Sequence, residues 1–337
     1  MTCLSRGDEL ISLCMRKDEV DHNEWERVLT LVVHDTVSWK GKQTLALNVP
    51  DGFLRTDGVA VLNDEVYVGL QNAGMAVFSL HEGSARAIGE KEGLPGVSVQ
   101  SLCAFQNRIY LFLAEALVTA RVKSRTQFLE YDPPGHKFRT LAGEATAEKQ
   151  SALDGLALDG GILIADTNRI WLQATEWSLD PTGHGHSGKT RLWNSPAGEI
   201  KMVEVPEAKQ VDPIICRANP TELARMVAMG LWPTHDTVYD RDGRAVFPLD
   251  APMDNQRPGC MGLTYDGRGM MVALLSVLQD QYRVVRCTSK EGRTAIIRKL
   301  LDGRPASTVK LLAGIEGGVL AVCDDGAAFL IKRKLSQ

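Results

Sequence analysis

The stretch DGLALDGGILIADTNRIWLQATE, which spans Asp154–Glu176, decides the fold that we expect. It contains an apolar run, a short turn at Asp159-Gly160-Gly161 and a second apolar run that ends at a polar break. Short Asn, Asp and Gly linkers between apolar runs are typical of β-hairpins. The run GILIAD is apolar without alternation, which is typical of a strand that is covered on both faces.

Four further segments repeat this arrangement of strand, tight turn and strand. They span 57–80, 100–122, 260–285 and 310–332, with turns at Asn63-Asp64, Gln106-Asn107, Asp266-Gly267 and Glu316-Gly317-Gly318. Successive segments begin about 42 to 55 residues apart, except for one gap of about 106 residues that can hold two units. Repeats of this length are typical of propeller blades, which are small antiparallel sheets that stack radially. We therefore predict an all-β chain that forms a β-propeller of six blades, with five and seven blades left open.

Two parts of the chain differ from the repeats. Residues 1–50 are predicted as a separate N-terminal segment, helical from Asp8 to Lys17 and then strand-like, which could complete the last blade. Residues 51–337 are predicted as the propeller, with one inserted helix near 219–230. Asn219 suits the N-cap of this helix, Pro220 its first position, and Gly230 its end.

The composition excludes some classes of partner. The chain has 337 residues, 38 Lys and Arg against 42 Asp and Glu, and a net charge of -4, so it lacks the basic excess of a dedicated nucleic-acid binder. It has no apolar run of about 18 residues, so we predict no membrane insertion. Its start does not resemble a secretory signal, and its seven cysteines form no C-x-x-C pair. We therefore expect free thiols and a cytoplasmic protein.

Some repeat segments resemble the two-component-regulator type of propeller repeat. The opening of that repeat matches GLPGVSVQSL (Gly93–Leu102), its middle strand matches Ile109-Tyr110-Leu111, and its end matches Tyr131-Asp132-Pro133. The preceding unit matches through VYVG (Val66–Gly69) and GMAVF (Gly74–Phe78). The resemblance covers about a quarter of the chain, and it implies a sensory or interaction module.

A second resemblance implies a different activity. The segment from Asp154 to Thr167 is similar to a blade of the gluconolactonase-like and NHL propellers, and DGVAV, beginning at Asp57, echoes it. The resemblance implies one divalent cation in the central channel, held by Asp57, Asp154 and Asp166. Oxygen ligands suit Ca²⁺ or Mg²⁺, and such an ion polarises an ester or lactone carbonyl. The alternative interpretation is that each aspartate caps a turn.

The stretch GHGHSGKT (Gly183–Thr190) satisfies the phosphate-binding pattern G-x-x-x-x-G-K-[ST]. A working phosphate-binding loop opens a helix, but Pro196 and Gly198 follow where that helix would run. His184 and His186 offer a metal pair without an obvious third ligand beyond Asp180. We therefore interpret the stretch as an exposed loop that follows a strand ending near Trp177.

These observations favour a non-catalytic interaction or sensor module that binds a ligand or a protein partner on one face and requires no cofactor. The alternative is a metal-dependent, lactonase-like hydrolase with Ca²⁺ or Mg²⁺ on the three aspartates.

Overall fold

The structure is a computed structural model, and it describes the chain in segments. The described residues are 2–6, 8–21, 24–35, 38, 40–49, 53–95, 98–114, 126–143, 158–165, 170–179, 185–195, 201–203, 226, 229–233, 237–240, 244–248, 259–265, 270–276, 281–287, 293–297, 309–315, 318–323 and 328–332. For the strands from residue 259 onward the backbone alone is described. The chain divides into two compact units, one of residues 13–32 and 43–207, the other of residues 2–12, 33–42 and 208–337.

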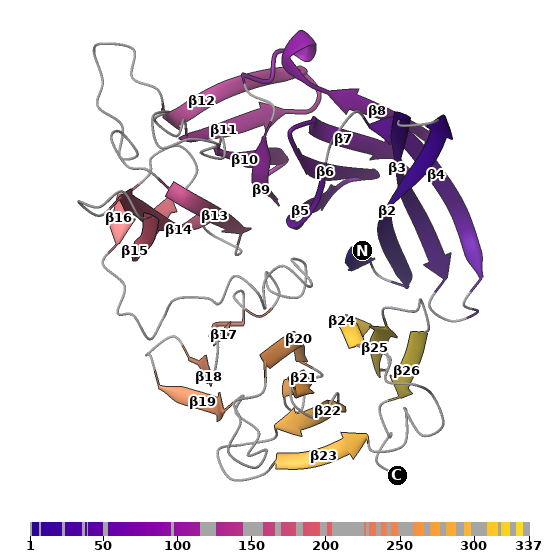
Figure 1. The fold of residues 1–337 in the computed structure, drawn as a ribbon, viewed down its shortest axis with the longest axis vertical. Coiled ribbons are helices and arrows are strands. Elements are labelled where there is room, and N and C mark those ends of the chain that lie inside the picture. The colour runs from indigo at the N-terminus through magenta and orange to yellow at the C-terminus, as the bar shows by residue number, and fades with distance from the viewer. Residues whose placement is uncertain are drawn as a thin grey trace. The chain divides into compact units, whose positions relative to one another are not determined.

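The first unit contains three four-stranded sheets in chain order (Figure 1). They comprise β5 (Phe53–Leu62), β6 (Glu65–Gln71), β7 (Gly74–Ser79) and β8 (Ser84–Ile88); β9 (Val99–Phe105), β10 (Arg108–Ala114), β11 (Thr126–Asp132) and β12 (Lys137–Gly143); and β13 (Leu158–Ala165), β14 (Ile170–Leu179), β15 (Gly185–Ser195) and β16 (Lys201–Val203). Neighbouring strands are antiparallel throughout these sheets. A short 3₁₀ helix, η1 (Glu90–Glu92), lies between β8 and β9.

The second unit contains three further antiparallel sheets. They comprise β17 (Trp232–Pro233), β18 (Thr237–Tyr239) and β19 (Ala245–Pro248); β20 (Gly259–Tyr265), β21 (Met270–Ser276), β22 (Gln281–Cys287) and β23 (Arg293–Ile297); and β24 (Val309–Ile315), β25 (Gly318–Cys323) and β26 (Ala328–Lys332). With the N-terminal sheet, the described residues thus form seven sheets, each built from strands that follow one another in the chain. The predicted number of blades in one ring stays a prediction.

Residues 2–49 form a four-stranded sheet of their own, which corrects the prediction of a helix over Asp8–Lys17. The strands are β1 (Thr2–Arg6), β2 (Glu9–Asp21), β3 (Glu24–Asp35) and β4 (Gly41–Val49). On β2 Leu10, Ile11 and Leu13 are buried, and on the neighbouring β3 the alternate residues Leu29, Leu31 and Val33 are buried. This period of two allows one face of the sheet to be buried, and it outweighs the helical propensity of the Glu, Leu, Met and Lys residues in the segment.

The core of the first unit lies between neighbouring sheets. On β10, Ile109, Leu111 and Leu113 belong to the cluster shared with sheet β5–β8. Tyr110 and Phe112 alternate with them and belong to the cluster shared with sheet β13–β16. The middle sheet is therefore apolar on both faces, as expected for a sheet that is packed between two others.

The first strands of these three sheets lie side by side. Strand β5 lies beside β9, and β9 lies beside β13 (Figure 1). The Oγ atom of Ser101 on β9 accepts a hydrogen bond of 2.9 Å from the backbone N–H of Leu163 on β13. In the second unit β20 and β1 likewise both lie beside β24.

The predicted hairpin turns agree with the structure in two repeats and differ in a third. Asn63-Asp64 and Gln106-Asn107 connect antiparallel strands, and Asn63, Gln106 and Asn107 have positive φ, which Asn tolerates well. Asp159-Gly160-Gly161 instead lies inside β13, where the register shifts between Leu158 and Gly160. The glycines therefore mark a β-bulge, and residues 166–169 connect β13 with β14.

The end of the predicted inserted helix falls within the described residues. Met226 is helical, Gly230 has a φ of 80°, and the N–H of Leu231 donates to the carbonyl of Met226 at 2.9 Å. This is the pattern by which a left-handed glycine ends a helix. The predicted start at Asn219 lies outside the described residues.

Candidate functional site

The three predicted metal ligands are described only in part. Asp57 lies on β5, in the stretch where the pairing with β6 shifts register between Leu54 and Val59, and its side chain is outside the description. Asp154 and Asp166 both lie outside the described residues. Among the side chains that are described, no group of three or more His, Cys, Asp or Glu residues is placed to hold a metal ion. The metal site on Asp57, Asp154 and Asp166 therefore stays a prediction.

The stretch that resembles a phosphate-binding loop lies mainly in a strand, which corrects the prediction of an exposed loop. Residues from Gly185 onward belong to β15, and β14 continues past Trp177 to Leu179. The pairing shifts register between Thr175 and Trp177, so the extra residues opposite Glu176 form a bulge. Since β15 leads into the antiparallel β16 and not into a helix, Lys189 and Thr190 lack the helix N-terminus that a phosphate-binding loop needs.

A more complete arrangement of polar side chains lies at one edge of the sheets. In a sheet of four consecutive antiparallel strands, the turn between the first and second strands and the turn between the third and fourth lie at the same edge. In sheets β5–β8 and β9–β12 these turns are residues 63–64, 80–83, 106–107 and 133–136. We call the end of the strands at which these turns lie the hairpin edge, as distinct from an edge strand. It is formed by short turns, so the side chains beside it are held by the ends of regular strands.

The first cluster at the hairpin edge lies between sheets β5–β8 and β9–β12. The hydroxyl of Tyr67 donates a short hydrogen bond to Glu65, which pairs with Arg86 at 3.5 Å. The ring of Tyr131, from the next sheet, meets the ring of Tyr67 edge-on at 6.3 Å. The hydroxyl of Tyr131 lies 3.2 Å from Nδ1 of His136. Rings that are fully buried thus support polar atoms that reach the edge.

The second cluster lies on the opposite face of sheet β9–β12. Glu130 accepts a hydrogen bond of 3.1 Å from the hydroxyl of Tyr110 and one of 2.7 Å from Arg139. Arg108 lies 3.9 Å from the same carboxylate, and its Nη1 is 2.8 Å from Oδ1 of Asp132 in an ion pair without hydrogen-bond geometry. Two guanidinium groups and one hydroxyl thus share one carboxylate.

The two clusters occupy equivalent positions in successive sheets. Tyr67 pairs across the sheet with Val77, which pairs with Arg86. Tyr110 pairs in the same way with Glu130, which pairs with Arg139. The tyrosine and the arginine are therefore retained from one sheet to the next.

The carboxylate between them comes from different strands. In the first cluster it is Glu65, the first residue of β6, and in the second that position is Arg108. The second carboxylate, Glu130, stands where the first cluster has Val77. In each of these two sheets, one acidic residue thus links a buried tyrosine to an exposed arginine.

Burial extends the pH range over which the phenols stay protonated, a range that at their ordinary pKa of about 10 already includes neutral pH. It raises the pKa of Tyr67, and the hydrogen bond to Glu65 raises that pKa further. Burial also raises the pKa of Tyr110 to about 12, with the charge of Glu130 as the next contribution. Both hydroxyls are therefore proton donors to carboxylates near neutral pH, which orients the carboxylates toward the arginines.

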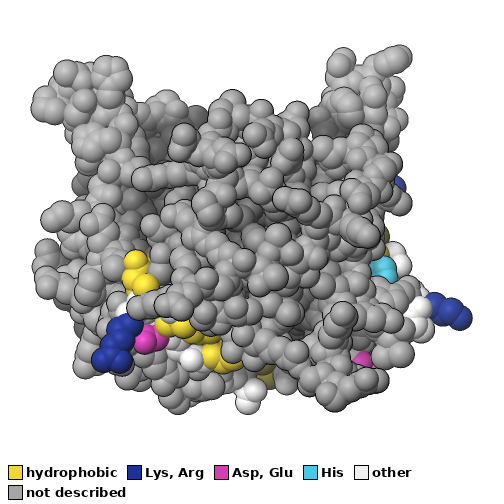
Figure 2. Space-filling model, turned by 90° about the horizontal axis from the view of Figure 1, so that it is seen from below, with side chains coloured by type: hydrophobic (Ala, Val, Ile, Leu, Met, Phe, Trp, Pro, Cys, Tyr) yellow, Lys and Arg dark blue, Asp and Glu magenta, His cyan; other side chains and the backbone are white. Residues whose placement is uncertain are grey.

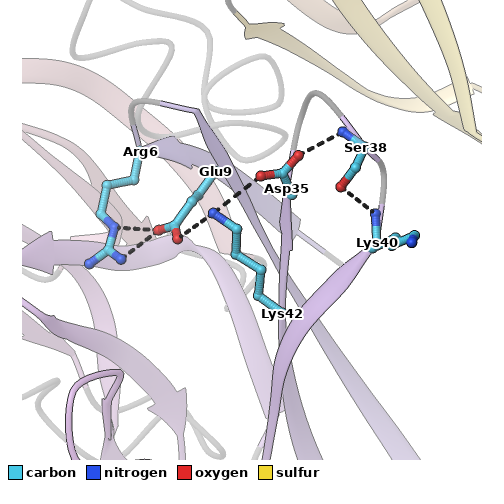
Figure 3. A network of polar contacts seen from close by, with 6 residues as sticks. All are labelled: Arg6, Glu9, Asp35, Ser38, Lys40 and Lys42. Atoms are coloured by element: carbon cyan, nitrogen blue, oxygen red, sulfur yellow. Dashed lines mark hydrogen bonds and ion pairs between the residues drawn. The ribbon is translucent and has the colours of Figure 1, made fainter.

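The N-terminal sheet carries a comparable network at its own hairpin edge (Figure 3). Glu9, the first residue of β2, accepts hydrogen bonds from Nε of Arg6 at 3.1 Å and from Nζ of Lys42 at 3.2 Å. Lys42 also lies 3.3 Å from Asp35, which accepts a 2.6 Å hydrogen bond from the backbone N–H of Ser38. The hydrogen bond from Arg6 is the main reason why the pKa of Glu9 is lowered.

Apolar side chains are scarce on the described surface. Met229, with 44% of its surface exposed, is the exposed large hydrophobic residue among those that the structure describes. On the face drawn in Figure 2, described hydrophobic side chains form a small band at the lower left that adjoins a basic and an acidic group. Among the described residues, no helix is long and apolar enough to cross a membrane. The described surface therefore offers charges and hydrogen bonds more than apolar contact.

Sequence analysis found the tyrosines but not their partners. Tyr67 and Tyr110 appeared as aromatic residues of the middle strands, whereas Glu65, Arg86, Glu130 and Arg139 were not singled out. One signal was present: in each of the five described four-stranded sheets a basic residue lies within the first three positions of the fourth strand. Its meaning depends on strand register, which the sequence alone does not provide.

No protein-family model matches the chain, and no curated protein matches its sequence. Among solved structures, the chain is similar to the β-propeller domain of the Trilobed protease from Pyrococcus furiosus, with 11% identity, a TM-score of 0.53, and 100% of this chain and 98% of that chain covered. The chain therefore has a β-propeller fold. This confirms the predicted type of fold, whereas the two-component-regulator type of repeat stays a prediction.

Two other propeller structures are similar over nearly the whole chain. One is PorZ, a bacterial surface component of the type-IX secretion system of Porphyromonas gingivalis, with 12% identity, a TM-score of 0.59, and 98% of this chain and 46% of that chain covered. The other is YCF48 bound to a D1 peptide, with 12% identity, a TM-score of 0.50, and 100% of this chain and 99% of that chain covered. At these identities the likeness concerns the fold.

Proposed function

We propose that this chain is a non-catalytic interaction module that binds a protein or peptide partner at the hairpin edge of its sheets. The observation that carries the proposal is the repeated pair of clusters, in which buried tyrosines and carboxylates hold Arg86 and Arg139 at the surface. The seven described sheets favour the upper end of the predicted range of five to seven blades.

Rigid anchors favour recognition because little conformational entropy is lost on binding. Arginine and tyrosine are also the residues that most often dominate binding energy at protein interfaces. In this chain the arginines are exposed and already oriented, while the tyrosines are buried beneath them. An interface at this edge needs no loop to become ordered.

The similar structures support this choice at the level of the fold. YCF48 was solved with a peptide bound, and PorZ is a component of a secretion system. Propellers host many unrelated functions, so these similarities motivate the proposal and do not identify a partner.

A displayed library of random peptides, selected against the full chain, tests the proposal. We expect families of enriched peptides that bind the purified protein and compete with one another for one surface. Failure to enrich any peptide that binds in solution would overturn the proposal, provided that the immobilised protein retains its β-sheet circular dichroism spectrum.

The lactonase-like hydrolase remains a second candidate because of one observation. Asp57 lies in the irregular stretch of β5, and register shifts of this kind often reorient side chains beside active sites. Under this proposal Asp57, Asp154 and Asp166 hold Ca²⁺ or Mg²⁺, which polarises a lactone carbonyl. Elemental analysis tests it: one bound divalent ion per chain, lost in both Asp57→Asn and Asp154→Asn, would support the hydrolase, and metal-free protein after dialysis against Ca²⁺ and Mg²⁺ would exclude it.

A further inference from the structure

The charges at the hairpin edge are not equally exposed. In the two clusters the arginine side chains of Arg86, Arg108 and Arg139 are 41%, 37% and 60% exposed. The carboxylates of Glu65, Glu130 and Asp132 are 27%, 14% and 32% exposed. The two clusters thus contain three basic and three acidic side chains, and in each ion pair the basic side chain is the more exposed partner.

The N-terminal sheet has the same order of exposure. Lys42 is 40% exposed, and its partners Glu9 and Asp35 are 17% and 21% exposed. Within each of these ion pairs an approaching molecule therefore meets the basic group first. The turns of the same edge also carry the exposed acidic residues Asp64 and Glu82, so the basic character belongs to the paired arginines and lysine and not to the whole edge.

A basic residue at this place is also a regular feature of the strands. In all five described four-stranded sheets, a Lys or Arg lies within the first three residues of the fourth strand, immediately after the last turn. These residues are Lys42 on β4, Arg86 on β8, Lys137 and Arg139 on β12, Lys201 on β16 and Arg293 on β23. These residues stand at the first, second or third position of the strand, so a basic residue is shared by this end of the sheets, whereas the exact register position of Arg86 and Arg139 is shared by sheets β5–β8 and β9–β12.

We infer that the hairpin edge binds an acidic protein segment, whose Asp or Glu carboxylates pair with the outward N–H groups of Arg86 and Arg139. This inference rests on the proposed function and names the partner's chemistry. A guanidinium group has five N–H donors. Arg139 bonds to Glu130 through Nη2, so it retains donors for a second carboxylate. The inner carboxylate fixes the orientation of the arginine, and the outer carboxylate belongs to the partner.

The same observations disfavour a nucleic acid at this edge. Proteins that bind single strands stack bases on exposed aromatic rings, whereas Tyr67, Tyr110 and Tyr131 are at most 2% exposed. Each arginine also has a carboxylate beside it, which repels a closely spaced row of phosphates. Carboxylates that are spaced along a peptide avoid both penalties.

The test uses the full chain and fluorescein-labelled synthetic peptides of matched length: a Glu-rich peptide, a Lys-rich peptide and a Gly-Ser peptide, with a single-stranded oligonucleotide as a fourth probe. We expect the Glu-rich peptide to bind most tightly, with an affinity that falls as salt is added. Arg86→Gln and Arg139→Gln should each weaken its binding by about tenfold, the loss expected for one charge-assisted hydrogen-bonded pair. Lys91→Gln, on η1 between β8 and β9, removes an equal charge elsewhere and should leave the affinity within about twofold.

A charge reversal provides an independent readout. Arg139→Glu should lose the Glu-rich peptide and gain affinity for the Lys-rich peptide. Arg139 is mostly exposed, so we expect these variants to fold, and circular dichroism checks this. Binding of the Glu-rich peptide that is unchanged in both arginine variants would overturn the inference, and the same holds if the oligonucleotide binds more tightly than the peptide. The proposed function would survive either result if library-selected peptides still bind, and it fails separately if none does.

Discussion

The hydroxyl oxygen of Ser101 accepts a hydrogen bond of 2.9 Å from the backbone N–H of Leu163, so a side chain of one sheet satisfies a backbone donor of the next. Ser101 is fully buried, and water is not at hand to replace this bond. Sheets that meet through apolar side chains are thus also joined at their first strands, β9 and β13, by a directional contact.

Removing this hydroxyl should destabilise the protein. Ser101→Ala leaves the N–H of Leu163 buried without its partner, which costs about 1–3 kcal/mol. The free energy of unfolding in urea measures this loss. Ser84→Ala, at an exposed serine that bonds to Glu82, is the control and should change stability by less than about 0.5 kcal/mol. Equal effects of the two substitutions would contradict the role of Ser101.

A methyl group at Gly69 should disturb the packing of two sheets. A Cβ atom at this position would lie 2.6 Å from Cγ1 of Val99 on the next sheet. We expect Gly69→Ala to cost about 1–3 kcal/mol of stability, measured by urea unfolding. In the double variant Gly69→Ala/Val99→Ala the cost should be smaller than the sum of the single effects by at least about 0.5 kcal/mol. Strict additivity would contradict this contact.

A carboxylate at the position that Glu65 occupies in the first cluster should be able to replace Glu130 in the second cluster. Glu130→Val, which copies Val77, removes the shared partner of Tyr110, Arg108 and Arg139 and should cost about 1–3 kcal/mol. Adding Arg108→Glu restores a carboxylate at the position of Glu65, and we expect it to recover about half of that loss. Arg108→Glu alone places a third carboxylate beside Glu130 and Asp132 and should destabilise the protein. Thermal unfolding measures the stability of the three variants. A double variant that is less stable than both single variants would refute the equivalence of the two carboxylate positions.

The N-terminal network should make stability depend on pH in the acidic range. The hydrogen bond from Arg6 lowers the pKa of Glu9 in the folded protein, whereas in the unfolded chain the pKa is near its usual value of about 4.3. A lowered carboxyl pKa contributes stability above the unfolded value, and this contribution is lost as the pH falls through the lower folded value. The unfolding free energies of wild type and Glu9→Gln should therefore differ at pH 7 and converge toward pH 3. A difference that stays constant over this range would contradict the assignment.

Local features predicted the hairpins well and the longer-range contacts poorly. Asn63 and Asn107 adopt the positive φ that asparagine tolerates well, so a single repeat suffices to recognise each turn. The segment Asp8–Lys17 was misread as a helix because its residues favour helices locally, whereas the strand forms by pairing with β3. Asp159-Gly160-Gly161 has the composition of a turn, and it forms a bulge because the partner strand continues past it.

The candidate site depends on the longer-range contacts between strands. Glu65 meets Arg86 only because β6, β7 and β8 pair in one particular register. The exchange of Glu65 and Val77 for Arg108 and Glu130 conceals the repeat from a residue-by-residue alignment. Only the pairing of the strands shows that both pairs of residues supply one carboxylate between a tyrosine and an arginine.

The order of the strands has a consequence for synthesis on the ribosome. Since each described sheet consists of consecutive strands, β5–β8 can complete its backbone pairing before Val99 has emerged from the ribosome. The nascent sheet would then expose Tyr67, Met75 and Val77 to solvent until β9–β12 emerges to cover them. We therefore expect β9–β12 to pack on a sheet β5–β8 that has already formed, and a pause in translation between the two sheets to prolong the exposure of this apolar face.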